Sequence, residues 1–162
     1  MVRLFKQTLT ACLIVVASVL LIGMLPLLLL TYAAYSAVLY VVVWLAWCTR
    51  SRNVLLVYSN SPNWQDYVET ELIPQLPENT IVLNWSERRS WPKLSLPVLV
   101  FRHFGGSREF NPIVLVFKPF HWTRTFRFWQ AFRAYKHGKP DLLFETQDRL
   151  TQYMNRVGVR AS

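Results

Sequence analysis

The sequence predicts a two-helix transmembrane hairpin followed by a small mixed-sheet α/β domain, and three observations lead to this fold class. The stretch between Lys6 and Arg50 contains no charged residue, which is typical of membrane helices. Four short apolar runs follow, and their β-branched composition indicates buried strands. Helical periodicity appears after the first run and again near the C-terminus. We therefore expect a membrane hairpin over residues 1–52 and an α/β domain over residues 53–162.

The uncharged stretch is too long for a single membrane span. As a helix it would reach about 60 Å, whereas a span of about 20 residues crosses roughly 30 Å of hydrocarbon. Tilting accounts for much less than this difference. Two spans near Thr8–Leu27 and Leu30–Cys48 fit the bilayer, with Pro26 and Thr31–Tyr32 available for the turn between them.

The basic residues predict that both termini are cytoplasmic. Arg3 and Lys6 precede the apolar stretch, Arg50 and Arg52 follow it, and no basic residue lies between. Basic residues beside spans tend to stay in the cytoplasm, so we expect an integral protein of the plasma or inner membrane. Two alternatives remain open. One is a secretory signal peptide cleaved near Ala34–Ser36. The other is one span followed by an interfacial helix, which would put the domain on the opposite side.

Cysteine and histidine positions exclude several chemistries for the domain. Both cysteines, Cys12 and Cys48, belong to the apolar stretch, so the domain has no disulfide, no thiolate nucleophile and no Cys-ligated zinc. The histidines at 103, 121 and 137 lack the spacing of metal ligands. We expect no metal ion and no cofactor, and no motif decides whether the protein is an enzyme.

The first half of the domain predicts a β-α-β unit. Val54–Tyr58 and Thr80–Leu83 are the predicted strands, and the helix between them begins at Ser61 as N-cap and Pro62 as first helical residue. Pro74 ends or kinks that helix. Its sheet-facing residues recur at helical spacing: Trp64, Val68 and Leu72. Because a helix connects the strands, they should be parallel.

The second half predicts a β-hairpin and two helices. Pro97–Phe101 and Ile113–Phe117 are the third and fourth predicted strands. Their connection is too short for a parallel crossover, so we expect an antiparallel hairpin with Gly105–Gly106 at the bend. Two helices then follow, one over Thr123–His137 and one from Pro140 to about residue 157.

The order β-α-β, β-hairpin, helix resembles the thioredoxin-like fold. The stretch "VLLVYSNSP…ELIPQL" is similar to that family's first strand, active-site turn and first long helix, whose internal proline is Pro74 here. "LPVLVFRHFGG" resembles the family's strand preceded by a cis proline, which would be Pro97. The sequence "SNSPNW" stands where the family carries Cys-x-x-Cys, so dithiol redox chemistry does not carry over. Only Trp85–Leu96 is available for the helix expected between strands two and three.

The opening of the domain also resembles a Toll-receptor-type (TIR) domain. This resemblance rests on "VYS", on a helix that carries Trp64 and Leu72–Pro74, and on the arginine-bearing loop after the second strand. No residue corresponds to that family's glutamate in a later helix. Its NAD-cleaving activity is therefore not implied for this chain.

Polar residues at the ends of the first two strands predict a ligand site. Strand one ends in "SNSPN" and strand two in "WSERRSW", and parallel strands bring their carboxyl ends to one edge. Arginine forks bind phosphate or carboxylate, and a helix start favours anions. The alternative is a solvated surface where Glu87 pairs with a nearby arginine. The candidate ligand-binding residues are Ser59, Asn60, Asn63, Glu87, Arg88 and Arg89.

The stretch of residues 117–139 is basic and aromatic, with six Lys or Arg, eight aromatic residues and no acid. On a helix the aromatic side would pack on the sheet, and the basic rim would face the anionic cytoplasmic leaflet. Nucleic acid also attracts such a mixture, but no nucleic-acid-binding motif is present, so we do not expect it. The candidate membrane-surface residues are Arg50, Arg52, Arg124, Arg127, Arg133 and Lys136.

These features predict a membrane-anchored, non-catalytic module for interaction or small-anion sensing, accessory to a membrane complex. Its expected partners are the bilayer, the anionic lipid surface and a membrane protein. The alternative is an enzyme acting on a phosphate- or carboxylate-bearing substrate at the edge formed by Ser59–Asn63 and Glu87–Arg89.

Overall fold

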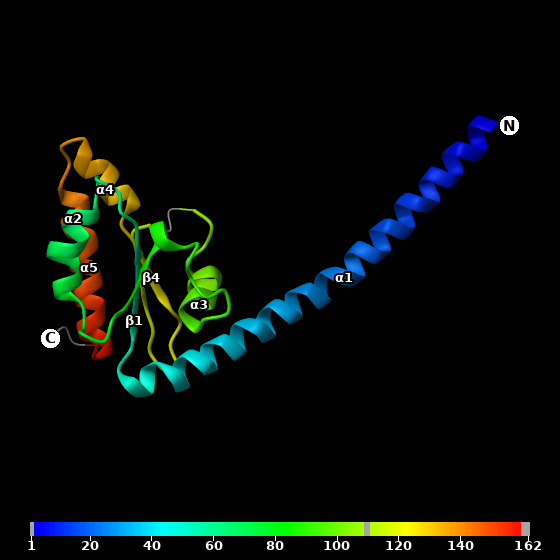
Figure 1. Ribbon diagram of the computed structural model, residues 1–162. Coiled ribbons are helices and arrows are strands. Elements are labelled where there is room, and N and C mark those ends of the chain that lie inside the picture. Colours follow the sequence, from blue (N-terminus) through cyan, green and yellow to red (C-terminus); the bar gives the residue numbers. More distant parts are fainter. Residues whose placement is uncertain (1, 109–110, 160–162) are drawn as a thin grey trace. The chain divides into compact units, whose positions relative to one another are not determined.

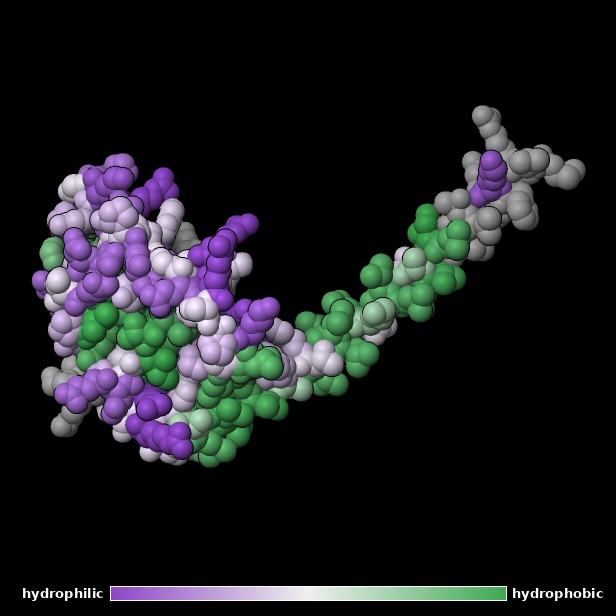
Figure 2. All heavy atoms as spheres, in the orientation of Figure 1, coloured by the Kyte–Doolittle hydropathy of each residue, from purple (hydrophilic) through white to green (hydrophobic). Residues whose placement is uncertain are grey.

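The computed structural model describes residues 2–108 and 111–159, and it forms two compact units, residues 1–40 and 41–162. The first unit consists of most of α1, a single helix that runs from Val2 to Ala46. Among the described residues, one helical segment, Leu13–Arg50, is long and apolar enough to cross a membrane. Its large apolar side chains between residues 13 and 38 are exposed, and Figure 2 shows hydrophobic residues along the visible face of this helix.

The turn predicted between two spans is absent from the described helix. Pro26 lies inside α1, and Thr31 is helical, with its hydroxyl donating to the carbonyl of Leu28 (2.9 Å). One proline removes a single backbone hydrogen bond, and the leucine-rich sequence on both sides favours continued helix. The structure therefore shows one continuous helix over the two predicted spans, Thr8–Leu27 and Leu30–Cys48, and a second membrane span stays a prediction.

The second unit contains a four-stranded mixed sheet in the order β2-β1-β3-β4. Its strands are β1 (Val54–Tyr58), β2 (Ile81–Asn84), β3 (Ile113–Val116) and β4 (Arg124–Arg127). β1 and β2 are parallel, while β3 is antiparallel to both of its neighbours, β1 and β4. The two central strands are buried along their whole length, and the two edge strands are partly exposed.

Helices cover both faces of the sheet (Figure 1). One face carries α4 (Trp129–Lys136), α5 (Asp141–Val157) and an irregular helix formed by α2 (Gln65–Tyr67), a π-helical turn (Val68–Leu72) and a 3-10 turn (Ile73–Gln75). The other face carries α3 (Leu96–Phe104). Short 3-10 turns follow α1 at Cys48–Arg50 and β2 at Trp85–Glu87. The main core joins strand residues to the helices of the first face.

Several predicted elements are confirmed. β1 and β3 lie where the apolar runs predicted them, and β2 starts within one residue of its predicted position. The β1–β2 pair is parallel, as the connecting helix required. Val68 and Leu72 are buried against the sheet, and α5 begins and ends beside Pro140 and Gly158. The prediction of a buried strand was wrong for β2, because β2 forms an edge of the sheet and is partly exposed.

The predicted third strand, Pro97–Phe101, is part of helix α3. A short continuous apolar run fits a buried strand or a buried helix equally well, so periodicity did not separate them. Val98 and Phe101, three residues apart, are both buried, which is helical spacing. A cis peptide bond lies between Asn111 and Pro112, directly before β3, and Pro97 lies in the first turn of α3.

The hairpin of this domain joins β3 to β4, not residues 97–101 to 113–117. The sequence predicts a helix over Thr123–His137, but Arg124–Arg127 pairs with Ile113–Val116 and α4 begins only at Trp129. The aromatic stripe of that region suggested a longer helix. Pairing with β3 overrides it, because the edge strand gains backbone hydrogen bonds from a neighbour that is already in the sheet.

Candidate functional site

The ends of β1 and β2 lie side by side, as predicted, and their polar groups bond to one another. The backbone N–H of Asn60 donates to Ser86 Oγ (3.0 Å), and the amide of Asn84 donates to Asn60 Oδ1 (2.6 Å). Asn84 Oδ1 also accepts from the backbone N–H of Ser86 (3.0 Å), which caps the turn at Trp85–Glu87. These bonds hold the two strand ends together. They also engage the polar side chains of Asn60, Asn84 and Ser86 with one another.

The other predicted ligand residues do not converge. Ser59 is buried, and both the backbone N–H and the side-chain amide of Asn63 lie within hydrogen-bonding distance of Ser61 Oγ (3.4 and 3.3 Å). The guanidinium of Arg88 stacks over the ring of Trp85 at 5.0 Å and donates to its carbonyl (3.2 Å). Glu87 and Arg89 are exposed. A ligand site at this edge stays a prediction.

Acidic groups surround the end of β1. The hydroxyl of Tyr58 donates to Glu69 Oε1 (2.9 Å). Burial raises the pKa of Tyr58 to about 12, and the hydrogen bond to Glu69 and the charges of Glu69 and Glu87 act in the same direction. Tyr58 therefore stays protonated and keeps its bond to Glu69 throughout the neutral range. The negative charge beside it makes this side of the edge less suited to an anion.

The two tryptophans of "NWSERRSW" pack on α3. Trp85, Trp91 and Phe101 form edge-to-face contacts with one another at 5.6–6.0 Å. A cavity of about 290 Å³ lies beside them, and both Arg88 and Arg102 line it. This cluster packs on α3 through Phe101, so it accounts for the aromatic residues of the stretch without a ligand.

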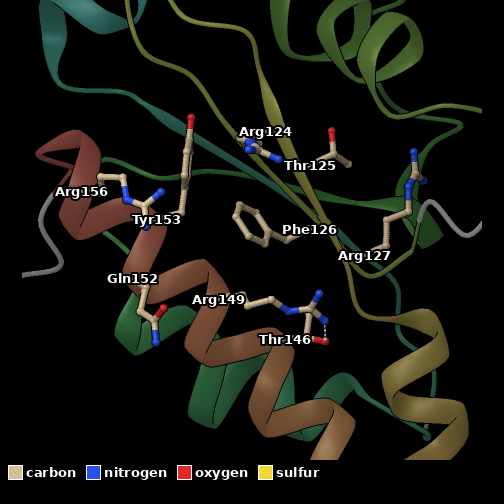
Figure 3. A pocket seen from close by; sticks show the side chains of 9 residues that line it. All are labelled: Arg124, Thr125, Phe126, Arg127, Thr146, Arg149, Gln152, Tyr153 and Arg156. Carbon is tan, nitrogen blue, oxygen red and sulfur yellow. Dashed lines mark hydrogen bonds between the residues drawn. The ribbon is translucent and has the colours of Figure 1, made fainter.

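A larger cavity, of about 480 Å³, lies between β4 and α5 (Figure 3). None of the described residues that line it is acidic, and four of them are arginines. One lining side chain, Thr146, is almost fully buried, with 6% of its surface exposed. The lining residues are Arg124, Thr125, Phe126, Arg127, Thr146, Arg149, Gln152, Tyr153 and Arg156.

The cavity arises from two regular elements. On α5, Thr146, Arg149, Tyr153 and Arg156 follow one another at three- and four-residue intervals, so they share one face of the helix. Figure 3 shows the side chains of this face projecting toward β4. β4 is an edge strand that pairs with β3 on one side, and α5 packs beside it.

Aromatic and polar contacts position the arginines. Arg124 lies over the ring of Tyr153 at 5.7 Å, and that ring packs against Phe126 at 5.8 Å. Arg149 Nη2 lies 3.5 Å from Thr146 Oγ1.

The remaining contacts leave the cavity positively charged. Arg149 forms an exposed salt bridge with Glu145 (3.7 Å), which contributes little in water. Arg127 turns outward and donates to the carbonyl of Arg108 (2.8 Å), as its direction in Figure 3 indicates. Arg124, Arg149 and Arg156 thus remain as the cationic wall of the cavity.

Sequence reasoning missed this site for an identifiable reason. Arg149 and Arg156 are seven residues apart on a correctly predicted helix, which was a usable signal. The sequence predicts a helix and a membrane-surface role for Arg124 and Arg127, whereas both residues line the cavity from β4. The other predicted membrane-surface residues are exposed: Arg50 and Arg52 after α1, and Arg133 and Lys136 on α4.

Within residues 2–108 and 111–159, no group of three or more His, Cys, Asp or Glu side chains lies close enough to hold a metal ion. No protein-family model, no curated protein and no solved structure matches the chain. The arginine-lined cavity between β4 and α5 is the candidate functional site.

Proposed function

We propose that this protein is a membrane-anchored, non-catalytic module whose α/β domain binds a phosphate-bearing anion in the cavity between β4 and α5. One observation carries the proposal: Arg124, Arg149 and Arg156 line one cavity, and no described lining residue is acidic. Like charges held together repel one another, and a bound anion removes that repulsion. Guanidinium groups also bind phosphate through paired, charge-assisted hydrogen bonds.

The size and walls of the cavity favour a phosphorylated small molecule. Sites for small ligands typically enclose about 300–1,000 Å³, and this cavity falls within that range. Phe126 and Tyr153 supply an apolar wall beside the arginines. A ligand with a phosphate group and a flat or apolar portion would engage both parts.

We also propose that the domain has a thioredoxin-like fold. The element order β1, α2, β2, α3, followed by the β3–β4 hairpin and α4, supports it. Helix α3 occupies the place between the second and third strands where that resemblance expects a helix. The absence of cysteine from residues 53–162 favours binding over redox chemistry.

We propose in addition that the domain is cytoplasmic and that the apolar stretch crosses the bilayer twice. Basic residues flank both ends of the stretch and none lies within it, which supports cytoplasmic ends. The 45 residues of α1 would extend about 67 Å, more than twice the hydrocarbon thickness. A turn near Pro26, where a backbone donor is missing, would bring both halves into the bilayer.

Thermal unfolding of the full-length protein in detergent micelles tests the anion site. Pyrophosphate or a nucleoside triphosphate at 100 times its Kd should stabilise the domain by about 2.7 kcal/mol and raise Tm by several degrees. Arg149→Ala and Arg124→Ala should abolish the shift. Arg133→Ala, which removes an exposed arginine stacked on Trp129 at 5.6 Å, is the matched control and should retain it. A shift that survives both cavity substitutions would refute the proposed site.

The alternative function is an enzyme acting on an anionic substrate at the edge formed by Ser59–Asn63 and Glu87–Arg89. The same assay separates the two proposals. A ligand-dependent shift that Arg88→Ala abolishes and Arg149→Ala leaves intact would move the anion site to the strand ends.

A further inference from the structure

The turn between β3 and β4 exposes two large aromatic side chains. Phe120 and Trp122 have 88% and 83% of their surface exposed, although both lie within a folded hairpin connection. Single exposed apolar residues are common. Two bulky aromatic residues at the tip of one turn, however, form an exposed hydrophobic patch whose contact with water is unfavourable. Such a patch is typical of a surface that binds a protein or a membrane.

The backbone fixes this turn. The N–H of His121 donates to the carbonyl of Lys118 (3.2 Å), and His121 Nδ1 lies 3.0 Å from the carbonyl of Pro119. Phe120 adopts a positive φ of 62°, a conformation that side chains other than glycine and asparagine rarely take. The aromatic tip is therefore presented by a defined turn.

The turn contacts the end of α1 within the same compact unit. The rings of Phe120 and Trp44 lie 5.2 Å apart at an angle of 47°. Trp47 is buried and packs edge-on against Phe117 at 5.7 Å. The C-terminal end of α1 therefore packs against the β3–β4 connection, through Trp44 and the following Trp47.

The helix end that the turn contacts belongs to the apolar segment Leu13–Arg50. Beside Trp44, three apolar residues of this end are exposed: Val41, Val42 and Leu45, with 48%, 40% and 68% of their surface accessible. Arg50, Arg52 and Lys118 follow the helix or begin the turn. Aromatic residues next to an apolar helix end, with basic residues close by, are characteristic of the membrane–water interface.

We infer that the turn of residues 118–123 inserts Phe120 and Trp122 into the interfacial layer of the bilayer that α1 enters. A lipid surface is favoured over a protein partner because the turn is attached to the helix end, and the membrane is already present there. The inference needs only that α1 is membrane-inserted, and it goes beyond the proposed anion site. Insertion of the turn would give the domain a second membrane contact besides α1. The start of β1 and the β3–β4 turn would then face the membrane. The predicted basic surface of α4 would then face the cytoplasm.

Nitroxide labels on the full-length protein in phosphatidylcholine–phosphatidylglycerol liposomes test this inference. In a background carrying Cys12→Ser and Cys48→Ser, labels at Phe120→Cys and Trp122→Cys should be accessible to oxygen and protected from a water-soluble nickel complex. Interfacial insertion corresponds to a depth of about 5–10 Å below the headgroup boundary.

The matched control is a label at Asn63→Cys. Asn63 is exposed and follows the far end of β1, whereas the strand starts beside the turn, where the N–H of Phe117 donates to the carbonyl of Asn53 (2.8 Å). The control label should be fully accessible to the nickel complex. Equal nickel accessibility at positions 63, 120 and 122 would overturn the inference.

Intrinsic fluorescence supplies a test without new cysteines. Lipids brominated near the headgroup should quench the tryptophan emission of the full-length protein, and Trp122→Phe should remove part of the quenched fraction. Trp129→Phe on α4 should lower the total emission but leave the intensity that is lost to quenching unchanged. Unchanged quenching in Trp122→Phe would show that this side chain is outside the interface and would contradict the inference.

Discussion

Tyr58 illustrates how a single residue joins the core to the polar edge of the sheet. Its side chain is buried, with 8% of its surface exposed, and its hydroxyl bonds to Glu69 on the helical segment that covers the sheet. This bond connects β1 to the π-helical turn Val68–Leu72, which packs on it. The irregular helix is thus held to β1 by this polar bond as well as by the packing of Val68 and Leu72 in the core.

Removing that hydroxyl should destabilise the domain. Tyr58→Phe should lower the free energy of unfolding by about 1 kcal/mol at neutral pH, because Glu69 loses a hydrogen bond. Urea unfolding of the full-length protein in detergent, compared with the exposed control Tyr135→Phe, measures this change. An unchanged midpoint in Tyr58→Phe would contradict the role of the bond.

The same residue predicts an alkaline loss of stability. The pKa of Tyr58 is raised from 10.0 to about 12, so the folded state holds the proton more tightly than the unfolded state. This contribution is fully present below pH 10.0 and is lost as the pH rises through about 12. The difference between the unfolding curves of wild type and Tyr58→Phe should shrink over that interval. A constant difference across it would refute the assignment.

At the scale of elements, α5 has two roles on two faces. Leu143, Leu150 and Met154 are buried in the main core, while Arg149, Tyr153 and Arg156 line the cavity. The core face sets the distance between the helix and the sheet. Because α5 also packs beside β4, the same packing determines where the arginines meet Arg124.

Truncating a side chain on the buried face of α5 should therefore lower the free energy of unfolding. Leu150 is almost fully buried, and Leu150→Ala should reduce the free energy of unfolding by about 2–5 kcal/mol through lost burial and a residual cavity. The adjacent exposed Thr151→Ala should change it by no more than about 0.5 kcal/mol. Thermal or urea unfolding of both variants checks the contrast, and similar values for the two would contradict the observed packing.

Two elements show why sequence pattern was insufficient. The run Leu96–Phe104 lacks the alternation of an edge strand and the polar face of an exposed helix, so its hydrophobic pattern did not separate a buried strand from a buried helix. Arg124–Arg127 carries two arginines and has no continuous apolar character, so no local signal predicted a strand. Its conformation depends on pairing with Ile113–Val116, which is a contact between separate segments.

For the whole molecule, the number of membrane crossings is the decisive question. Both ends of the apolar stretch are basic, which favours an even number of crossings and a cytoplasmic domain. A single continuous crossing would leave about half of α1 outside the hydrocarbon, because the helix is more than twice as long as the bilayer is thick. The exposed leucines, valines and isoleucines along it make that arrangement unfavourable in water.

Labelling of single cysteines in cells distinguishes the two arrangements. In the background lacking Cys12 and Cys48, Val2→Cys and Asn63→Cys should both resist a membrane-impermeant maleimide in intact cells and react after lysis. This result is expected for two crossings with both ends inside. Labelling of only one of the two positions in intact cells would demonstrate an odd number of crossings and disprove the hairpin.

The sequence by itself determined the long apolar segment, the strands β1, β2 and β3, and helix α5. Their signals are local: absence of charge, continuous apolar runs and a repeated helical period. Only the tertiary structure decided that residues 96–104 are helical, that residues 124–127 form an edge strand, and that Arg124 meets Arg149 and Arg156. The physical reason is that strand pairing and the packing of a helix on a sheet bring together residues distant in sequence, and no local pattern records such contacts.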